Sequence, residues 1–147
     1  MNRLLGVVMD PIETIQPQKD TTLAILLAAQ RSGWKLVYFQ QGDLSIRDGV
    51  PLGKGNILTV TDDNDAWFEL GESWSEGLEN LDAILMRKDP PFDMEYIYTT
   101  YILELAEHHG SLIVNKPSSL RDINEKAYTA WFSHCTPPSL ITRSQDS

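Results

Sequence analysis

The chain has 147 residues, of which 41% are hydrophobic and 22% are charged, and its formal net charge is −9. This length suffices for one domain with a hydrophobic core, and the composition is typical of a globular protein. The negative charge argues against nucleic acid and against an anionic membrane surface as partners, because both are bound through basic patches. No stretch resembles a signal peptide or a transmembrane helix, and the single cysteine, Cys135, cannot form an internal disulfide. We therefore expect a cytoplasmic protein in which Cys135 is a small packed side chain.

The first forty residues predict a strand, a helix and a second strand. Leu4–Met9 is a short apolar run, which is typical of a strand buried on both faces of a parallel sheet. Asp20 can cap a helix that begins at Thr21, and Gly33 stands where such a helix would end. Lys35–Phe39 is the next predicted strand. Together these elements predict a β–α–β unit with parallel strands.

The region that follows gives weaker patterns. Asp48–Gly49 is a turn dipeptide and predicts a small hairpin between its flanking segments. Ile57–Val60 predicts another short strand. We expect Ala66–Glu72 to be helical and the acidic segment Ser73–Asn80 to be a loop.

A buried central strand is predicted over Ala83–Met86, and Arg87, Lys88 and Asp89 follow it directly. Two prolines then stop further strand pairing. In an open α/β sheet, ligands bind just beyond the carboxyl ends of the strands, so this charged triplet is a candidate site. The alternative is a solvated strand end with an ordinary turn.

The last third of the chain continues the alternation of helix and strand. Its predicted elements are a helix over Met94–His108 capped by Asp93, a strand over Leu112–Val114, a helix capped by Asn124 and a strand over Leu140–Thr142. Trp131 and Phe132 would lie on the buried side of the second helix. The whole pattern predicts an α/β fold with a doubly wound, mostly parallel sheet.

Polar groups follow three of the predicted strands. Asp10 follows the first strand, Arg87 to Asp89 follow the central strand, and Asn115–Lys116 follow the later one. If the strands are parallel, these groups converge on one edge of the sheet. A cation and a carboxylate on that edge could hold the carboxylate and ammonium groups of an amino acid or peptide. Equally, they could pair with each other.

Several common catalytic motifs are missing from the sequence. It holds no Walker A loop, no GxGxxG and no GxSxG, so it predicts neither a glycine-rich phosphate loop nor a hydrolase elbow. His108 and His109 are adjacent and cannot both face one metal ion from one helix face. A phospho-acceptor receiver domain is another interpretation, because Asp10, Asp89 and Lys116 follow successive strands. The sequence lacks the second acid that a receiver carries after its first strand.

Several segments resemble the bacterial glutathione synthetases. They are VVMDPI at 7–12, MRKDPPFD at 86–93, YILE at 101–104, LIVNKP at 112–117, LRD at 120–122 and NEKAYTAWF at 124–132. The similarity runs from the first strand to about Arg143. It implies a pre-ATP-grasp, Rossmann-like domain over residues 1–122. It also implies that 123–147 begin an ATP-grasp domain whose remainder is absent from this chain.

The resemblance implies an ATP-dependent carbon–nitrogen ligase of glutathione biosynthesis, which joins γ-glutamylcysteine to glycine. In such an enzyme, ATP first phosphorylates the γ-glutamylcysteine carboxylate, and the glycine amine then attacks the acyl phosphate. Magnesium (Mg2+) offsets the charge of the phosphates. The resemblance also implies a homo-oligomer.

Four site residues follow from the resemblance. Lys126, the lysine of NEK, would contact the ATP phosphates, and Asp10, Arg87 and Asp89 would contact the dipeptide or glycine. The catalytic residues and the magnesium ligands would lie in the part of the family's sequence beyond this chain. We therefore expect the 147-residue chain alone to have no ligase activity, as a fragment, a truncated product or half of a split enzyme. The alternative is a catalytically inactive truncated module that oligomerises or binds peptide.

Overall fold

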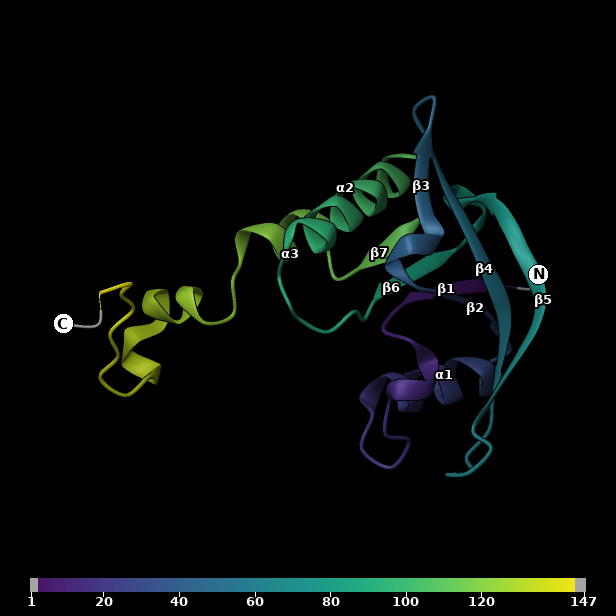
Figure 1. The fold of residues 1–147 in the computed structure, drawn as a ribbon, viewed down its shortest axis with the longest axis horizontal. Helices are drawn as coiled ribbons and strands as arrows, with labels where there is room; N and C mark the ends of the chain where they lie inside the picture. The colour runs from purple at the N-terminus through teal and green to yellow at the C-terminus, as the bar shows by residue number, and fades with distance from the viewer. Residues whose placement is uncertain (1–2, 145–147) are drawn as a thin grey trace.

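The computed structural model describes residues 3–144, which form one seven-stranded sheet with helices on both faces (Figure 1). The strands are β1 (Leu4–Val8), β2 (Lys35–Phe39), β3 (Leu44–Arg47), β4 (Val50–Val60), β5 (Phe68–Gly77), β6 (Ala83–Met86) and β7 (Leu112–Val114). The helices are α1 (Thr21–Arg31), α2 (Met94–His108) and α3 (Pro117–Asp122), with 3₁₀ segments at Ile12–Thr14, Gln41–Asp43, Leu78–Asn80 and Ala127–Cys135. Within residues 3–144, no helix is long and apolar enough to cross a membrane.

The sheet is mixed, so the prediction of a mostly parallel sheet is wrong for half of it. β2, β1, β6 and β7 lie side by side in that order and run parallel to one another. β4 is antiparallel to its neighbours and pairs with β2 and β3 along one edge and with β5 along the other. The long strands β4 and β5 curl around one end of the sheet (Figure 1). The predicted β–α–β unit is confirmed, since β1 and β2 are parallel neighbours joined through α1.

β5 stands where the sequence predicts a helix over Ala66–Glu72 and a loop over Ser73–Asn80. Both predictions are wrong, because Phe68–Gly77 is a strand that pairs with β4 on both sides of a β-bulge. Trp74 is the one fully buried side chain of this strand, and most of the others are exposed. The strand therefore lacks the alternation of apolar and polar residues that would predict it. Its conformation is fixed by backbone pairing with β4, a contact that is not local in sequence.

The predicted hairpin at Asp48–Gly49 is confirmed. These two residues form the turn between β3 and β4, and Arg47 pairs with Val50 across it. Asp48 and Gly49 have φ angles of 51° and 80°, the backbone that a two-residue hairpin turn requires. The short strand predicted over Ile57–Val60 is the end of the longer strand β4.

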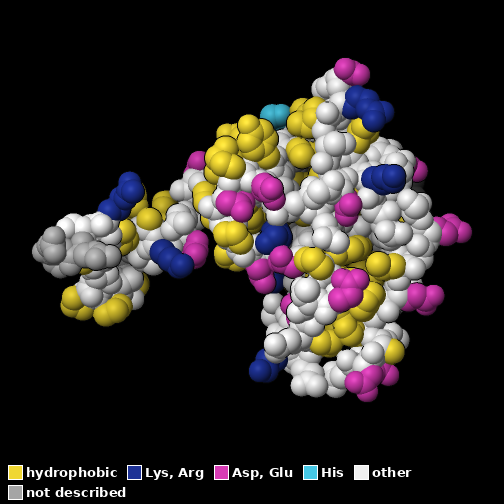
Figure 2. Space-filling model, in the orientation of Figure 1, with side chains coloured by type: hydrophobic (Ala, Val, Ile, Leu, Met, Phe, Trp, Pro, Cys, Tyr) yellow, Lys and Arg dark blue, Asp and Glu magenta, His cyan; other side chains and the backbone are white. Residues whose placement is uncertain are grey.

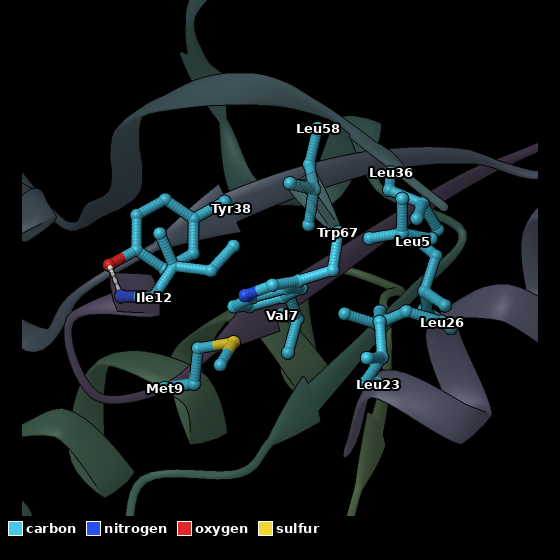
Figure 3. Packing of buried hydrophobic residues seen from close by; sticks show 12 residues of the cluster. Leu5, Val7, Met9, Ile12, Leu23, Leu26, Leu36, Tyr38, Leu58 and Trp67 are labelled. Atoms are coloured by element: carbon cyan, nitrogen blue, oxygen red, sulfur yellow. Dashed lines mark hydrogen bonds between the residues drawn. The ribbon is translucent and has the colours of Figure 1, made fainter. Parts of the chain in front are cut away.

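α1 and α2 cover opposite faces of the sheet, which is the doubly wound arrangement predicted. Successive residues of β1 point to opposite sides, so Val7 belongs to the core that includes Leu26 of α1 (Figure 3), and Val8 belongs to the core that includes Leu103 of α2. Burial of each such side chain contributes about 1.5–3 kcal/mol. The two cores hold the parallel strands rigidly and thereby fix the position of the loops at their carboxyl ends.

Both long helices begin at the predicted caps. The side chain of Asp20 accepts a hydrogen bond from the Leu23 N–H at 3.0 Å, and Asp93 accepts one from the Tyr96 N–H at 2.9 Å. Gly33 follows the end of α1 with a φ of 85°, a conformation that glycine adopts without strain.

The segment after α3 projects away from the sheet (Figure 1). Its 3₁₀ segment, Ala127–Cys135, buries no side chain, and Trp131 and Phe132 are 69% and 51% exposed. Cys135 is also exposed. The predicted burial of these three side chains is therefore wrong, because the sheet does not reach them. Leu140–Thr142 forms no strand.

Candidate functional site

A cavity of about 210 Å³ lies at the carboxyl ends of β1 and β6, and we call it the strand-end cavity. It is lined by Met9, Asp10, Ile15, Lys19, Asp20, Thr21, Thr22, Arg87 and Asp89. Val8 pairs with Met86 in the parallel sheet, so the loops that follow these two residues leave the sheet side by side. The structure thus brings together Asp10, Arg87 and Asp89, three of the residues singled out in the sequence.

The carboxylate of Asp10 bridges the two strand ends. Its Oδ1 lies 2.9 Å from Lys88 Nζ, and its Oδ2 accepts a hydrogen bond from the Asp89 N–H at 2.9 Å. Lys88 Nζ also donates to the Asp89 carbonyl at 2.6 Å. The side chains of Lys88 and Asp10 are only 16% and 28% exposed, so this ion pair is partly shielded from water. Asp10 therefore follows the second of the two alternatives, in which the polar groups at the strand ends pair with each other and not with a ligand.

The guanidinium of Arg87 turns instead to the first turn of α1. Its Nε donates to the Thr22 hydroxyl at 3.0 Å and its Nη2 to the Thr21 hydroxyl at 3.1 Å. Among residues 3–144, no carboxylate lies within ion-pair distance of this guanidinium. Two neutral hydroxyls thus fix its position while its charge stays unneutralised. This arrangement suits the binding of a ligand carboxylate.

Tyr38 of β2 supports the loop that carries Asp10. Its hydroxyl accepts a hydrogen bond from the Ile12 N–H at 3.1 Å (Figure 3) and donates to the Asp10 carbonyl at 3.4 Å. The side chain is buried, and burial raises the pKa of the Tyr38 hydroxyl above its ordinary value. The hydroxyl therefore stays protonated and keeps both hydrogen bonds over the whole neutral range.

A second cavity, of about 380 Å³, contains Lys126, and we call it the lysine cavity. It is lined by Lys88, Pro90, Pro91, Phe92, Tyr96, Leu120, Ile123, Asn124, Glu125 and Lys126. Lys88 lines this second cavity, and its ammonium forms the ion pair with Asp10, which lines the strand-end cavity. Lys126 is exposed and has no ion-pair partner within the described part of the chain. Its N–H donates to Asn124 Oδ1 at 3.1 Å, but the N-cap of Ala127–Cys135 is Lys126, so the prediction of Asn124 as the cap is wrong.

The third predicted strand end does not join the strand-end cavity. Lys116 Nζ lies 4.0 Å from Glu107 of α2, and neither Asn115 nor Lys116 lines the cavity. The described residues also contain no group of three or more His, Cys, Asp or Glu side chains that could hold a metal ion.

A larger groove, of about 520 Å³, lies at the opposite end of the sheet, where β2 begins. Its walls include Trp34, Leu36, Ile57 and Leu58, and its only charged side chains are Lys35 and Glu72. It lacks the converging, fixed charges of the strand-end cavity. We therefore place the candidate site at the strand ends.

Sequence reasoning missed four residues of the site: Lys19, Thr21, Thr22 and Tyr38. The first three are close to the predicted cap at Asp20, and helix N-termini are common places for anions. That position was the one available signal for them. Nothing in the strand pattern distinguishes Tyr38 from an ordinary core aromatic residue.

The sequence of the matched region identifies the family. Residues 4–121 match the family described as prokaryotic glutathione synthetase, N-terminal domain. The chain belongs to the prokaryotic glutathione synthetase family. Asp10, Arg87 and Asp89 lie inside the part of the chain that matches this glutathione synthetase domain, and Lys126 lies after it.

Several curated glutathione synthetases are similar to the chain. The protein of Yersinia pestis is 56% identical over 142 residues, which cover 97% of this chain and 44% of the relative. The protein of Shewanella oneidensis is 55% identical over 139 residues, which cover 95% of this chain and 44% of the relative. The protein of Pseudomonas syringae pv. tomato is 54% identical over 146 residues, which cover 99% of this chain and 46% of the relative. The chain thus spans a little under half the length of these glutathione synthetases.

Proposed function

We propose that this chain supplies the peptide-binding side and one phosphate contact of a cytoplasmic, ATP-dependent ligase that joins γ-glutamylcysteine to glycine. The observation that carries the proposal is the unneutralised guanidinium of Arg87, fixed by two threonines in the strand-end cavity. Membership of the glutathione synthetase family supports it, since the relatives bear that name.

The charges of the strand-end cavity fit an amino-acid group of the dipeptide. Arg87 binds its carboxylate, the side chain of Asp89 takes its ammonium group, and Asp10, which is paired with Lys88 and accepts the Asp89 N–H, holds Asp89 in place beside the ligand. The cavity, at about 210 Å³, is smaller than the roughly 300–1,000 Å³ of typical ligand pockets. It therefore holds one end of γ-glutamylcysteine, and the rest of the dipeptide extends towards the lysine cavity.

Lys126 takes the role of a phosphate contact for ATP. Its ammonium is free of ion pairs among the described residues and opens into the same cavity as Lys88. In the proposed reaction, a carboxylate oxygen of γ-glutamylcysteine bonds to the γ-phosphorus and ADP leaves. The glycine nitrogen then bonds to the acyl carbon and inorganic phosphate leaves. This chain orients the dipeptide and neutralises phosphate charge.

The remaining parts of the ligase are proposed to lie outside this chain. The residues described here offer no ligand set for magnesium, so its binding and the catalytic residues are assigned to the portion that the curated relatives have in addition. We propose residues 1–122 as the pre-ATP-grasp, Rossmann-like domain and 123–147 as the beginning of an ATP-grasp domain.

A chimaera tests this proposal. Residues 1–143 of the chain replace the equivalent part of the Yersinia pestis relative, and ADP release is measured with γ-glutamylcysteine and glycine. We expect activity that depends on both substrates, a higher KM for γ-glutamylcysteine in Arg87→Met and a higher KM for ATP in Lys126→Met. The 147-residue chain alone is expected to release no ADP. A folded chimaera without activity, or an Arg87→Met variant with unchanged KM, would contradict the proposal.

A second candidate function is that of an inactive module that oligomerises or binds peptide. Figure 2 shows hydrophobic side chains over α2 and on the projecting segment. Met94, Tyr98 and Trp131 are among the exposed ones. Exposed apolar surface of this kind favours association between copies. Sedimentation velocity at micromolar concentration tests this second function. Oligomers would support the oligomerising module, and a clean monomer would argue against it.

A further inference from the structure

Arg121 of α3 is held by three groups of α2. Its Nη2 lies 2.6 Å from Glu104 Oε2, its Nη1 donates to the Thr100 hydroxyl at 3.2 Å, and its Cζ lies 4.5 Å from the centre of the Tyr101 ring. The Arg121 side chain is only 17% exposed. A planar guanidinium can make two hydrogen bonds and stack on a ring at once, whereas a lysine ammonium cannot do all three.

These contacts join the segment that begins with α3 to helix α2. Of residues 117–143, only Arg121 makes an ion pair or a side-chain hydrogen bond with residues 3–116. The backbone bonds of this segment stay within it, apart from the Leu120 N–H, which donates to the adjoining Lys116 carbonyl. This guanidinium thus anchors α3, and through it the residues 123–143 that follow, to α2.

The segment that follows α3 leads directly to Lys126. The Ile123 N–H donates to the Ser119 carbonyl at 2.9 Å, and Asn124 Oδ1 accepts from the N–H groups of Lys126 and Ala127. These local bonds connect Lys126 to α3 through an ordered turn. Any tilt of α3 therefore moves the Lys126 side chain.

The same segment lies against the first turn of α2. Burial, followed by the nearby carboxylate of Glu125, raises the pKa of the Tyr96 hydroxyl. Tyr96, Glu125 and Lys126 all line the lysine cavity. Residues of α2 and of the segment that begins in α3 therefore line this cavity together, with Lys88 and Lys126 both among its lining residues.

We propose that Arg121 is a positioning residue, which clamps α3 to α2 and so holds Lys126 at the cavity that it shares with Lys88. The proposal rests on the phosphate role proposed above for Lys126. Arg121 itself does not line the lysine cavity. Its effect on a bound anion therefore passes through the placement of Lys126.

The first measurement is a distance between two spin labels on the full 147-residue chain. One label sits on the native Cys135, which is exposed, and the other on Thr59→Cys, an exposed position of β4. We expect one narrow distance distribution with Arg121 intact, a broad one in Arg121→Met, and an intermediate one in Arg121→Lys. Arg47→Met is the matched control, because Arg47 is exposed on β3, has no ion pair among the described residues and loses the same charge.

The second measurement is the binding of inorganic tripolyphosphate to the same variants. We expect Arg121→Met to weaken it by about fivefold or more, the lower end of ordinary coupling between linked sites, although Lys126 is intact. Lys126→Met should abolish binding, and Arg47→Met should match the parent. If Arg121 has a merely structural role, Arg121→Met will lower the thermal stability of the chain. It will then bind tripolyphosphate as tightly as Arg47→Met does.

The outcomes separate this inference from the proposed function. An unchanged distance distribution in Arg121→Met overturns the clamp, whatever the tripolyphosphate result. A broader distribution with unchanged affinity shows that the clamp does not position Lys126 and also overturns the inference. If the parent chain binds no tripolyphosphate, or Lys126→Met binds it equally well, the phosphate role of Lys126 fails, and the distance distributions alone decide whether Arg121 clamps α3.

Discussion

Lys88 Nζ lies 2.9 Å from Asp10 Oδ1, so the loop after β6 is tied to the loop after β1. The two residues are far apart in sequence and meet because β1 and β6 are parallel neighbours. Lys88 also lines the lysine cavity, whereas Asp10 lines the strand-end cavity. This ion pair therefore connects a residue of the strand-end cavity with a residue of the lysine cavity.

Asp10→Asn tests the ion pair. The amide oxygen can still accept the Asp89 N–H, but Lys88 loses its charged partner. We expect the free energy of unfolding to fall by about 1 kcal/mol, because the pair is only partly buried. Urea unfolding measures this change. Asp48→Asn in the exposed hairpin turn is the control and should leave stability unchanged; equal stability of both variants would show that the pair contributes nothing.

Tyr38→Phe tests the support of the Asp10 loop. The substitution removes the oxygen that accepts the buried Ile12 N–H. A buried donor without a partner costs about 1–3 kcal/mol, so the free energy of unfolding should fall by that amount. Urea unfolding provides the measurement, and Tyr98→Phe, at an exposed position of α2, should be neutral. A neutral Tyr38→Phe would mean that water replaces the hydroxyl.

The stability of the chain should fall at alkaline pH through Tyr38 and Tyr96. Burial is the main cause of the raised pKa of both hydroxyls, so both hold their protons more tightly in the folded than in the unfolded state. Their contribution is complete below the unfolded pKa of about 10 and is lost as pH rises from there through the folded pKa. Thermal unfolding between about pH 9 and 11 measures the loss. The stability of Tyr38→Phe should fall less steeply with rising pH than that of the parent chain. If it falls as steeply as the parent's, Tyr38 does not contribute to the alkaline loss of stability.

Gly55 is a position where the sheet leaves no room for a side chain. A Cβ there would collide with the Tyr38 carbonyl oxygen and the Phe39 ring. We expect Gly55→Ala to lower the free energy of unfolding by about 1–3 kcal/mol, as overpacking does. Gly42→Ala is the control, since nothing lies within 4 Å of its Cβ. Chemical denaturation of both variants gives the comparison, and equal midpoints would contradict the packing described for β2 and β4.

The parallel half of the sheet and its site could be predicted because the signals there are local. Leu4–Met9 and Ala83–Met86 are continuous apolar runs, and Asp10 and Arg87 follow them directly. Parallel pairing then brings the two strand ends together without further information. The partners of Arg87 could not be predicted, because Thr21 and Thr22 reach it only when α1 packs on the sheet.

The failures lie where structure depends on distant contacts. β5 carries a single fully buried side chain, Trp74, so its pairing with β4 leaves no periodic pattern in the sequence. Ala127–Cys135 shows the opposite case, in which the sequence carries an apolar pattern but the structure does not bury it. Trp131 and Phe132 suggest a buried helix face, but no part of the described chain covers them. Apolar periodicity predicts a face that can be buried and not the surface that buries it.

The most direct test of the central claim is a titration of the 15N-labelled chain with γ-glutamylcysteine, followed by NMR. We expect saturable shifts of the amides of Thr21, Thr22, Arg87 and Asp89, which line the strand-end cavity. Arg87→Met should lose these shifts, whereas Arg47→Met, with the same change of charge, should keep them. Absence of saturable shifts in the parent chain, or equal binding by Arg87→Met, would contradict the claim that Arg87 in the strand-end cavity binds the dipeptide.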